Sequence, residues 1–78
     1  AEATAQAIRS AGGTAHALRA DVAAADDCAE QVEETVRRLG RVDILVNNAG
    51  IGMHKLALDT SLEDWERVMR INLTGSFL

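Results

Sequence analysis

Val42-Asp43-Ile44-Leu45-Val46-Asn47-Asn48-Ala49-Gly50 is the stretch of sequence that decides the fold. Its centre, residues 44–46, is a short apolar run rich in β-branched side chains, which is typical of a strand buried on both faces of a parallel sheet. The run changes at once into two asparagines, an alanine and a glycine. A strand that ends in this way places amides and bare backbone at the carboxyl edge of a sheet, where open α/β folds bind their ligands. We therefore expect the functional site at this edge.

Two helices and one further strand are predicted before this stretch. The Ala-rich residues 1–11 favour a helix that ends at Gly12-Gly13, where glycine can adopt a left-handed cap. Residues 24–39 predict an amphipathic helix, with acidic residues in the first turn, basic residues in the last and Gly40 as its end. Residues 14–22 alternate only moderately, and are predicted to form a strand mainly because they lie between these helices. This order is typical of βαβ units, with parallel strands and a right-handed crossover.

A loop and a third helix are predicted after the central strand. Residues 51–59 have no clear period and follow a glycine, which indicates a loop. Two overlapping capping boxes come next, Thr60 with Glu63 and Ser61 with Asp64, and either pair is able to begin a helix. The apolar stripe of that helix, with the only tryptophan expected to anchor packing, is Leu62, Trp65, Val68 or Met69, and Leu73.

The composition excludes several classes of protein. The net charge of -4 provides no basic patch for nucleic acid, and no apolar run approaches the roughly 18 residues of a membrane span. The single cysteine, Cys28, allows neither an internal disulfide nor a Cys-pair zinc site, and we expect it to be a small core side chain. His16 and His54 are too isolated to form a metal site, so none is expected. The default compartment is the cytoplasm.

Several of these motifs together resemble the short-chain dehydrogenase/reductase family, most closely the 3-oxoacyl-acyl-carrier-protein reductases and related alcohol or sugar dehydrogenases. The likeness spans almost the whole chain and depends on four features in order: Asp21-Val22, the Asn-Asn-Ala-Gly tetrad at 47–50, Trp65, and Ile71-Asn72-Leu73-Thr74-Gly75. It implies a doubly wound α/β Rossmann fold that binds NAD or NADP. It also implies hydride transfer between the nicotinamide and a small-molecule carbonyl or secondary alcohol, in a homotetramer or dimer.

The resemblance also assigns cofactor contacts. Asp21 and Val22 match the family's adenine contact, in which a carboxylate accepts the exocyclic amino hydrogen and the next backbone amide bonds a ring nitrogen. Asn48, Ala49 and Gly50 match the loop along the adenosine ribose, where close approach requires small residues. The alternatives are that Asp21 merely ends a strand and caps the next helix, and that the tetrad is an ordinary polar turn.

Asn72 matches the asparagine of the family's Asn-Ser-Tyr-Lys catalytic set, where it helps to hold a water of the proton relay. The alternative is a surface asparagine that locally bends a helix. The Ser, Tyr and Lys of the set, the Gly-rich turn and the residue that selects NAD or NADP have no match in these 78 residues. We therefore expect residues 1–78 to be the central part of one NAD(P)-binding domain, truncated at both ends and inactive alone. A non-catalytic nucleotide-binding regulator and an extended-type sugar-nucleotide epimerase stay open as alternatives.

Overall fold

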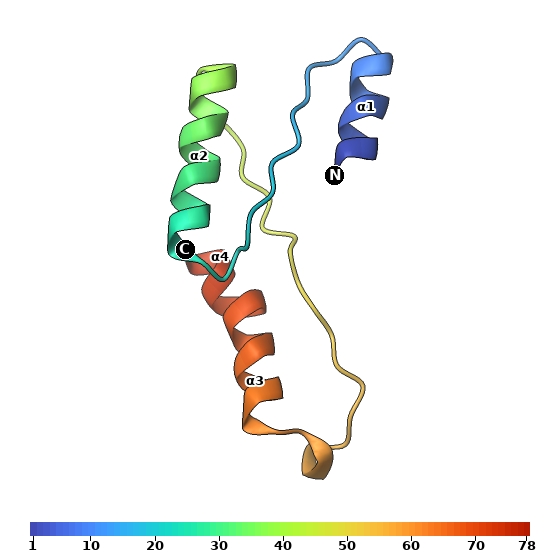
Figure 1. Cartoon of the computed structure of the whole chain (residues 1–78), viewed down its shortest axis with the longest axis vertical. Helices are drawn as coiled ribbons and strands as arrows, with labels where there is room; N and C mark the ends of the chain where they lie inside the picture. Colours follow the sequence, from blue (N-terminus) through green and yellow to red (C-terminus); the bar gives the residue numbers. More distant parts are fainter.

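The computed structural model describes all 78 residues and contains helices joined by two long extended segments (Figure 1). The two predicted N-terminal helices and the helix after Ser61 are confirmed, to within one or two residues at each boundary. No helix is long and apolar enough to cross a membrane. The elements are α1 (Glu2–Ser10), α2 (Ala25–Leu39), the 3-10 turn η1 (Ala57–Asp59), α3 (Leu62–Met69), the π turn η2 (Arg70–Thr74) and α4 (Gly75–Phe77).

The two predicted strands are not present as paired strands. Residues 14–22 and 42–47 run without helix or turn over most of their length, yet neither belongs to a hydrogen-bonded ladder. The reason is topological, because the usual Rossmann strand order 3-2-1-4-5-6 separates the third and fourth strands by two others. These two segments, matched to the third and fourth strands, therefore do not pair with each other. The parallel sheet and its right-handed crossover stay predictions.

The predicted burial of the central strand is also wrong for this chain. Ile44, Leu45 and Val46 are 83%, 72% and 75% exposed, and only Ala5 and Cys28 are buried. The radius of gyration is 15.7 Å, compared with about 11.5 Å for a compact domain of this length. The chain is thus open, and it supplies no layers to cover both faces of residues 44–46. Cys28 is the core side chain that the sequence predicted.

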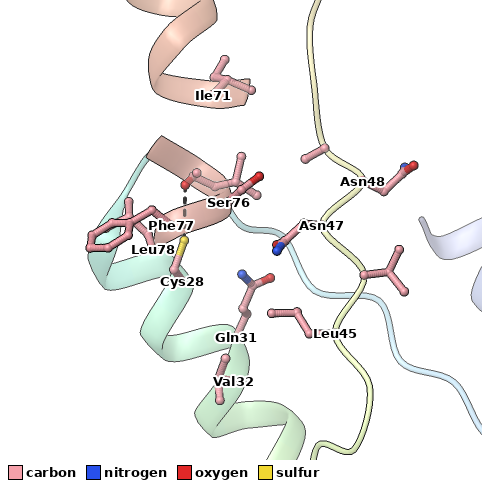
Figure 2. Close-up of a pocket in the computed structure, with 14 residues that line it drawn as sticks. Cys28, Gln31, Val32, Leu45, Asn47, Asn48, Ile71, Ser76, Phe77 and Leu78 are labelled. Carbon is pink, nitrogen blue, oxygen red and sulfur yellow. Dashed lines mark hydrogen bonds between the residues drawn. The ribbon is translucent and has the colours of Figure 1, made fainter. Parts of the chain in front are cut away.

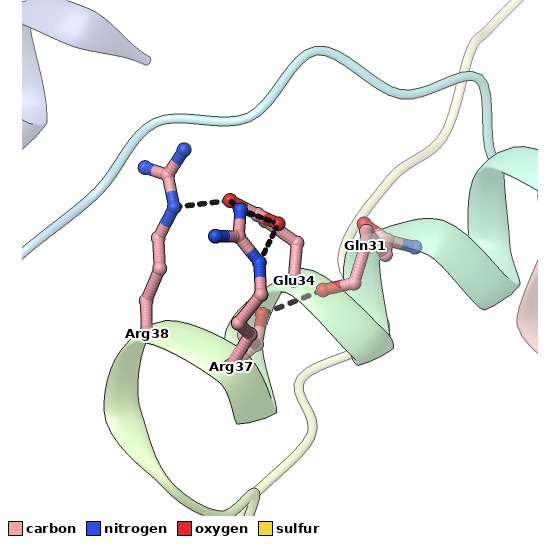
Figure 3. Close-up of polar contacts among 5 residues, drawn as sticks. Gln31, Glu34, Arg37 and Arg38 are labelled. Carbon is pink, nitrogen blue, oxygen red and sulfur yellow. Dashed lines mark hydrogen bonds and ion pairs between the residues drawn. The ribbon is translucent and has the colours of Figure 1, made fainter.

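A local signal fixes the C-terminal end of α2. Gly40 has a φ of 94°, a conformation that favours glycine, and its N–H donates to the Val36 carbonyl. On the exposed face, the Glu34 carboxylate accepts hydrogen bonds from Arg37 and Arg38 (Figure 3). These bonds, chiefly that from Arg37, lower the pKa of Glu34, and the same contact raises the pKa of Arg37. Both oxygens of Glu34 are engaged by arginines, so this carboxylate is not free for chemistry.

The second of the two possible capping boxes begins α3. Ser61 Oγ accepts from the Asp64 N–H at 3.0 Å, and Asp64 Oδ2 accepts from the Ser61 N–H at 3.4 Å. Thr60 does not cap the helix, because its hydroxyl donates instead to the Leu56 carbonyl. Trp65 is 59% exposed, so the expectation that it anchors packing is wrong within this chain, where nothing covers that face of α3.

The helix continues from α3 through η2 into α4, but with a change of winding. The Gly75 N–H donates to the Arg70 carbonyl, five residues back, which defines the π turn. Single π turns inside helices occur frequently at functional sites. Asn72 lies within this turn, so the helix distortion that the alternative interpretation of this asparagine allowed takes the form of an extra residue in one helical turn.

Candidate functional site

A hollow lies between α2, residues 45–49 and α4 (Figure 2). Three predicted cofactor residues, Val22, Asn48 and Ala49, line it. Figure 2 shows Asn47 pointing towards Gln31 of α2 and Asn48 pointing away from that helix. This alternation is expected of extended backbone. The two amides of the tetrad therefore serve opposite sides of the segment, and only Asn48 is turned away from α2.

Asn72 is held by the backbone that follows the tetrad. Its Oδ1 accepts from the Ile51 N–H and its Nδ2 donates to the Ile51 carbonyl, both at 2.8 Å. Its side chain thereby satisfies both backbone groups of one residue, as a neighbouring strand would. A Cβ on Gly50 would lie 3.4 Å from Asn72 Oδ1, at ordinary van der Waals contact. The predicted catalytic Asn72 and the predicted cofactor residue Gly50 therefore lie side by side.

Asp21 and Val22 form a tight turn whose polar groups are almost all engaged. The Asp21 N–H donates to Asp27 Oδ2 at 2.8 Å, and the Asp21 carbonyl accepts from the Ala24 N–H at 3.0 Å. Asp21 Oδ1 accepts from the Ala23 N–H at 2.9 Å. The Val22 carbonyl accepts from Cys28 Sγ at 3.3 Å. Within the chain, only Asp21 Oδ2 and the Val22 N–H are left without a partner.

This remaining acceptor and donor are adjacent in the sequence and suit the edge of an adenine. Adenine presents an amino group that donates and, beside it, a ring nitrogen that accepts. The bond from the Ala23 N–H to Asp21 Oδ1 closes a local turn through the side chain. It uses only one carboxylate oxygen, however, so the turn and an adenine contact are compatible. Asp21 does not cap α2, whose N-cap residue is Ala24.

Gly75 is a site residue that the sequence analysis did not single out. A Cβ at this position would lie 3.0 Å from both Cγ2 and the carbonyl oxygen of Val22. Such a contact is tighter than an ordinary side chain tolerates, so glycine lets the start of α4 lie against the Asp21-Val22 turn. The available signal was a glycine inside an otherwise helical pattern, which usually has a packing or functional reason.

The helix from α3 to α4 therefore contacts both groups of predicted residues. Gly75 meets Val22 at one point, and Asn72 meets the Gly50-Ile51 backbone less than one turn earlier. Asn48 and Ala49 directly precede Gly50 in the sequence, and they line the hollow together with Val22. The structure thus gathers Val22, Asn48, Ala49, Gly50 and Asn72 along one helix, whereas Asp21 lies at its margin and does not line the hollow.

An ion pair ties the following loop to the start of α3. Lys55 Nζ lies 2.8 Å from Asp64 Oδ2. This hydrogen bond, followed by that from the Ser61 N–H, lowers the pKa of Asp64. The loop of residues 51–59 is consequently attached to one helix at two points, by Ile51 to Asn72 and by Lys55 to Asp64.

The whole chain, residues 1–78, matches the family model described as short chain dehydrogenase. It is 48% identical over 67 residues to a 3-oxoacyl-acyl-carrier-protein reductase of Synechocystis sp., covering 86% of this chain and 27% of the relative. It is 35% identical over 79 residues to glucose 1-dehydrogenase 2 of Bacillus subtilis, covering 100% of this chain and 31% of that protein.

Solved structures give the same result. A short-chain dehydrogenase/reductase variant of Serratia marcescens superimposes with a TM-score of 0.92 at 38% identity, over 99% of this chain and 31% of that one. A short chain dehydrogenase of Mycobacterium smegmatis matches with a TM-score of 0.92 at 32% identity, over 97% and 32%. The chain thus spans about a third or less of the proteins it matches, which have the Rossmann α/β fold. This chain belongs to the short-chain dehydrogenase family.

Proposed function

We propose that residues 1–78 are the central part of a single-domain NAD(P)-dependent oxidoreductase, which transfers a hydride between the nicotinamide and a carbonyl or secondary alcohol. Family membership supports this reaction class, because the named relatives are reductases and dehydrogenases. The bound dinucleotide would supply or accept the hydride. The 3-oxoacyl-acyl-carrier-protein reductase relative makes a 3-oxoacyl thioester the first substrate to test.

The observation that carries the proposal is the pair of open groups at the Asp21-Val22 turn. One carboxylate oxygen of Asp21 and the Val22 N–H stay free, while the other polar groups of these two residues are engaged. An acceptor and a donor in adjacent positions bind the amino group and ring nitrogen of adenine. In the proposed enzyme this turn holds the adenine, and Asn48, Ala49 and Gly50 lie along the ribose.

The proposed role of Asn72 has two parts. Its amide holds the Ile51 backbone, which fixes the loop that follows the cofactor-binding tetrad. One Nδ2 hydrogen and one Oδ1 lone pair are not used by these two bonds. We assign to them the water of the proton relay, so Asn72 both positions the loop and takes part in proton transfer.

Binding and turnover by the full-length protein test this function together. The protein is expected to bind ADP-ribose. It is also expected to oxidise NADH or NADPH in the presence of a 3-oxoacyl thioester or another small carbonyl compound, measured as the loss of dinucleotide absorbance. Comparison of the two dinucleotides gives the coenzyme preference. Binding without turnover on any carbonyl or alcohol would indicate a nucleotide-binding regulator. Failure to bind would contradict the proposal altogether.

The remaining parts of the proposal concern assembly and location. We propose a homodimer or homotetramer, as the family resemblance implies, and the cytoplasm as its compartment, the default for this composition. Sedimentation of the full-length protein measures the first, and fractionation of cells that express it measures the second. A monomer at micromolar concentration would contradict the proposed assembly without affecting the proposed reaction.

A further inference from the structure

Asp27 is the side chain that fixes the backbone of the Asp21-Val22 turn. It occupies the third position of α2, where an acidic side chain commonly reaches back to the N-cap backbone. Here it reaches further back and accepts the Asp21 N–H at 2.8 Å. The N-cap residue Ala24 instead donates its N–H to the Asp21 carbonyl. The Ala24 N–H therefore closes the turn by a backbone hydrogen bond, and the Asp27 side chain attaches the turn to the first turn of α2.

The neighbouring residue of α2 strengthens this attachment. Cys28 is buried, and its Sγ donates to the Val22 carbonyl at 3.3 Å. Two successive residues of the first helical turn thus bind the N–H of Asp21 and the carbonyl of Val22. These bonds hold the two peptide units on either side of the Asp21–Val22 peptide, to which the open Val22 N–H belongs.

We infer that Asp27 is a positioning residue for adenine recognition: its bond to the Asp21 N–H orients the free Asp21 Oδ2 and the free Val22 N–H as one donor and acceptor pair. This inference rests on the proposed function, since it assumes that the turn meets the adenine. Asp27 is assigned no contact with the base, because its Oδ2 is engaged by the Asp21 N–H. It acts only through the geometry of the turn.

Asp26 provides a matched control. It lies beside Asp27 in the same first turn, carries the same charge, and interacts equally with the helix dipole. It is exposed and makes no hydrogen bond to the turn. Asp26→Ala and Asp27→Ala therefore remove the same charge from the same turn of α2, and differ in the bond to the Asp21 N–H.

The test measures discrimination between two bases by the full-length protein. Dinucleotide fluorescence gives the affinity for NADH and NADPH and for their hypoxanthine analogues. Hypoxanthine carries a carbonyl in place of the amino group and a hydrogen on the ring nitrogen, so it reverses the donor and acceptor that the turn would meet. The unmodified protein and Asp26→Ala are expected to prefer adenine equally. Asp27→Ala is expected to lower that preference by about threefold to tenfold, the loss of one oriented hydrogen bond.

Two further measurements separate this role from a general loss of folding. Asp27→Asn keeps an oxygen acceptor and is expected to restore most of the preference. Amide exchange at Asp21 is expected to accelerate in Asp27→Ala and not in Asp26→Ala. An equal base preference in all variants, with binding intact, would overturn the positioning role of Asp27 alone. Absence of adenine dinucleotide binding by the unmodified protein would overturn both this role and the proposed function.

Discussion

The two ends of the segment from Val42 to Ile51 differ in what holds them. At the apolar end, Ile44, Leu45 and Val46 are largely exposed and take part in no ladder. At the polar end, the Asn72 amide binds both backbone groups of Ile51. One end depends on neighbouring strands that these 78 residues do not supply, whereas the other is complete within them. Contacts within these 78 residues therefore fix the polar end of the segment, whereas the apolar end requires the neighbouring strands of the sheet.

This difference is also energetic. Full burial of a Val, Leu or Ile side chain stabilises a fold by about 1.5 to 3 kcal/mol. Within this chain, residues 44–46 gain little of that stabilisation because they keep most of their exposure. The edge instead depends on a few directional bonds, each of which contributes about 0.5 to 1.5 kcal/mol. The apolar end should thus control stability, and the polar end should control activity.

The largest expected effect is on stability, from Leu45→Ala in the full-length protein. If the family's sheet buries residues 44–46, this truncation should lower the free energy of unfolding by about 2 to 5 kcal/mol, because it leaves a cavity in a packed core. Urea denaturation measures the change. Leu58→Ala, in the predicted loop and outside the predicted strand, is the control, and should change stability by about 0.5 kcal/mol or less if its side chain stays exposed in the full-length protein as it is in this chain. Equal effects of the two substitutions would show that residues 44–46 are not a buried strand.

The sequence predicted the features that depend on neighbours within a few residues. Gly40 ends α2, and Ser61 with Asp64 begins α3, because glycine conformation and capping are local properties. The contact of Gly75 with Val22 and the pairing of Asn72 with Ile51 were not predicted, since each joins distant parts of the chain. The exposure of residues 44–46 was not predicted, because an apolar run indicates burial in a complete sheet with covering helices, whereas these 78 residues do not contain those layers.

The next largest effect should be on activity, from Asn72→Ala. This change removes both bonds to Ile51 and releases the backbone beside Gly50, and misplacement of about 1 Å in an active site can cost roughly 100-fold in rate. We expect a decrease of that order in kcat/KM, with faster amide exchange at Ile51. Arg70→Ala, an exposed residue of the same π turn, is the control. Asn72→Asp keeps the acceptor for the Ile51 N–H but loses the donor to the Ile51 carbonyl, so its activity should lie between that of Asn72→Ala and that of the unmodified protein. Unchanged exchange at Ile51 in Asn72→Ala would contradict the positioning role.

A smaller effect is expected from Gly75→Ala. The new Cβ would meet Val22 at 3.0 Å, and the displacement should destabilise the protein by about 1 to 3 kcal/mol. Because the Asp21-Val22 turn moves with Val22, affinity for ADP-ribose should also decrease, which calorimetry measures. Gly52→Ala is the control, since a Cβ there would meet nothing within 4 Å. Full ADP-ribose affinity in Gly75→Ala would show that the contact between α4 and the Asp21-Val22 turn does not affect binding.

The capping box allows a still smaller comparison, between two adjacent hydroxyl residues. Ser61→Ala removes the side chain that accepts from the Asp64 N–H, so it should lower the free energy of unfolding by about 1 kcal/mol. Thr60→Ala removes only a bond to the Leu56 carbonyl outside the helix and should have less effect. A larger loss for Thr60→Ala, measured by thermal unfolding, would indicate that the first capping box operates in the full-length protein.

The smallest expected effect is a pH dependence at the Lys55–Asp64 pair. In the folded protein, chiefly the Lys55 hydrogen bond lowers the pKa of Asp64 below its ordinary value of 3.8. A carboxylate with a depressed pKa contributes stability that is complete above the unfolded value and is lost as the pH falls through the folded value. Lys55→Gln should raise the folded pKa of Asp64 towards its ordinary value, so the acid loss of stability should begin at the same pH, end at a higher pH and be smaller in total. Because both side chains are partly exposed, added salt should reduce the difference between Lys55→Gln and the unmodified protein. The uncharged bonds between Asn72 and Ile51, at the start of the loop, should be insensitive to both pH and salt.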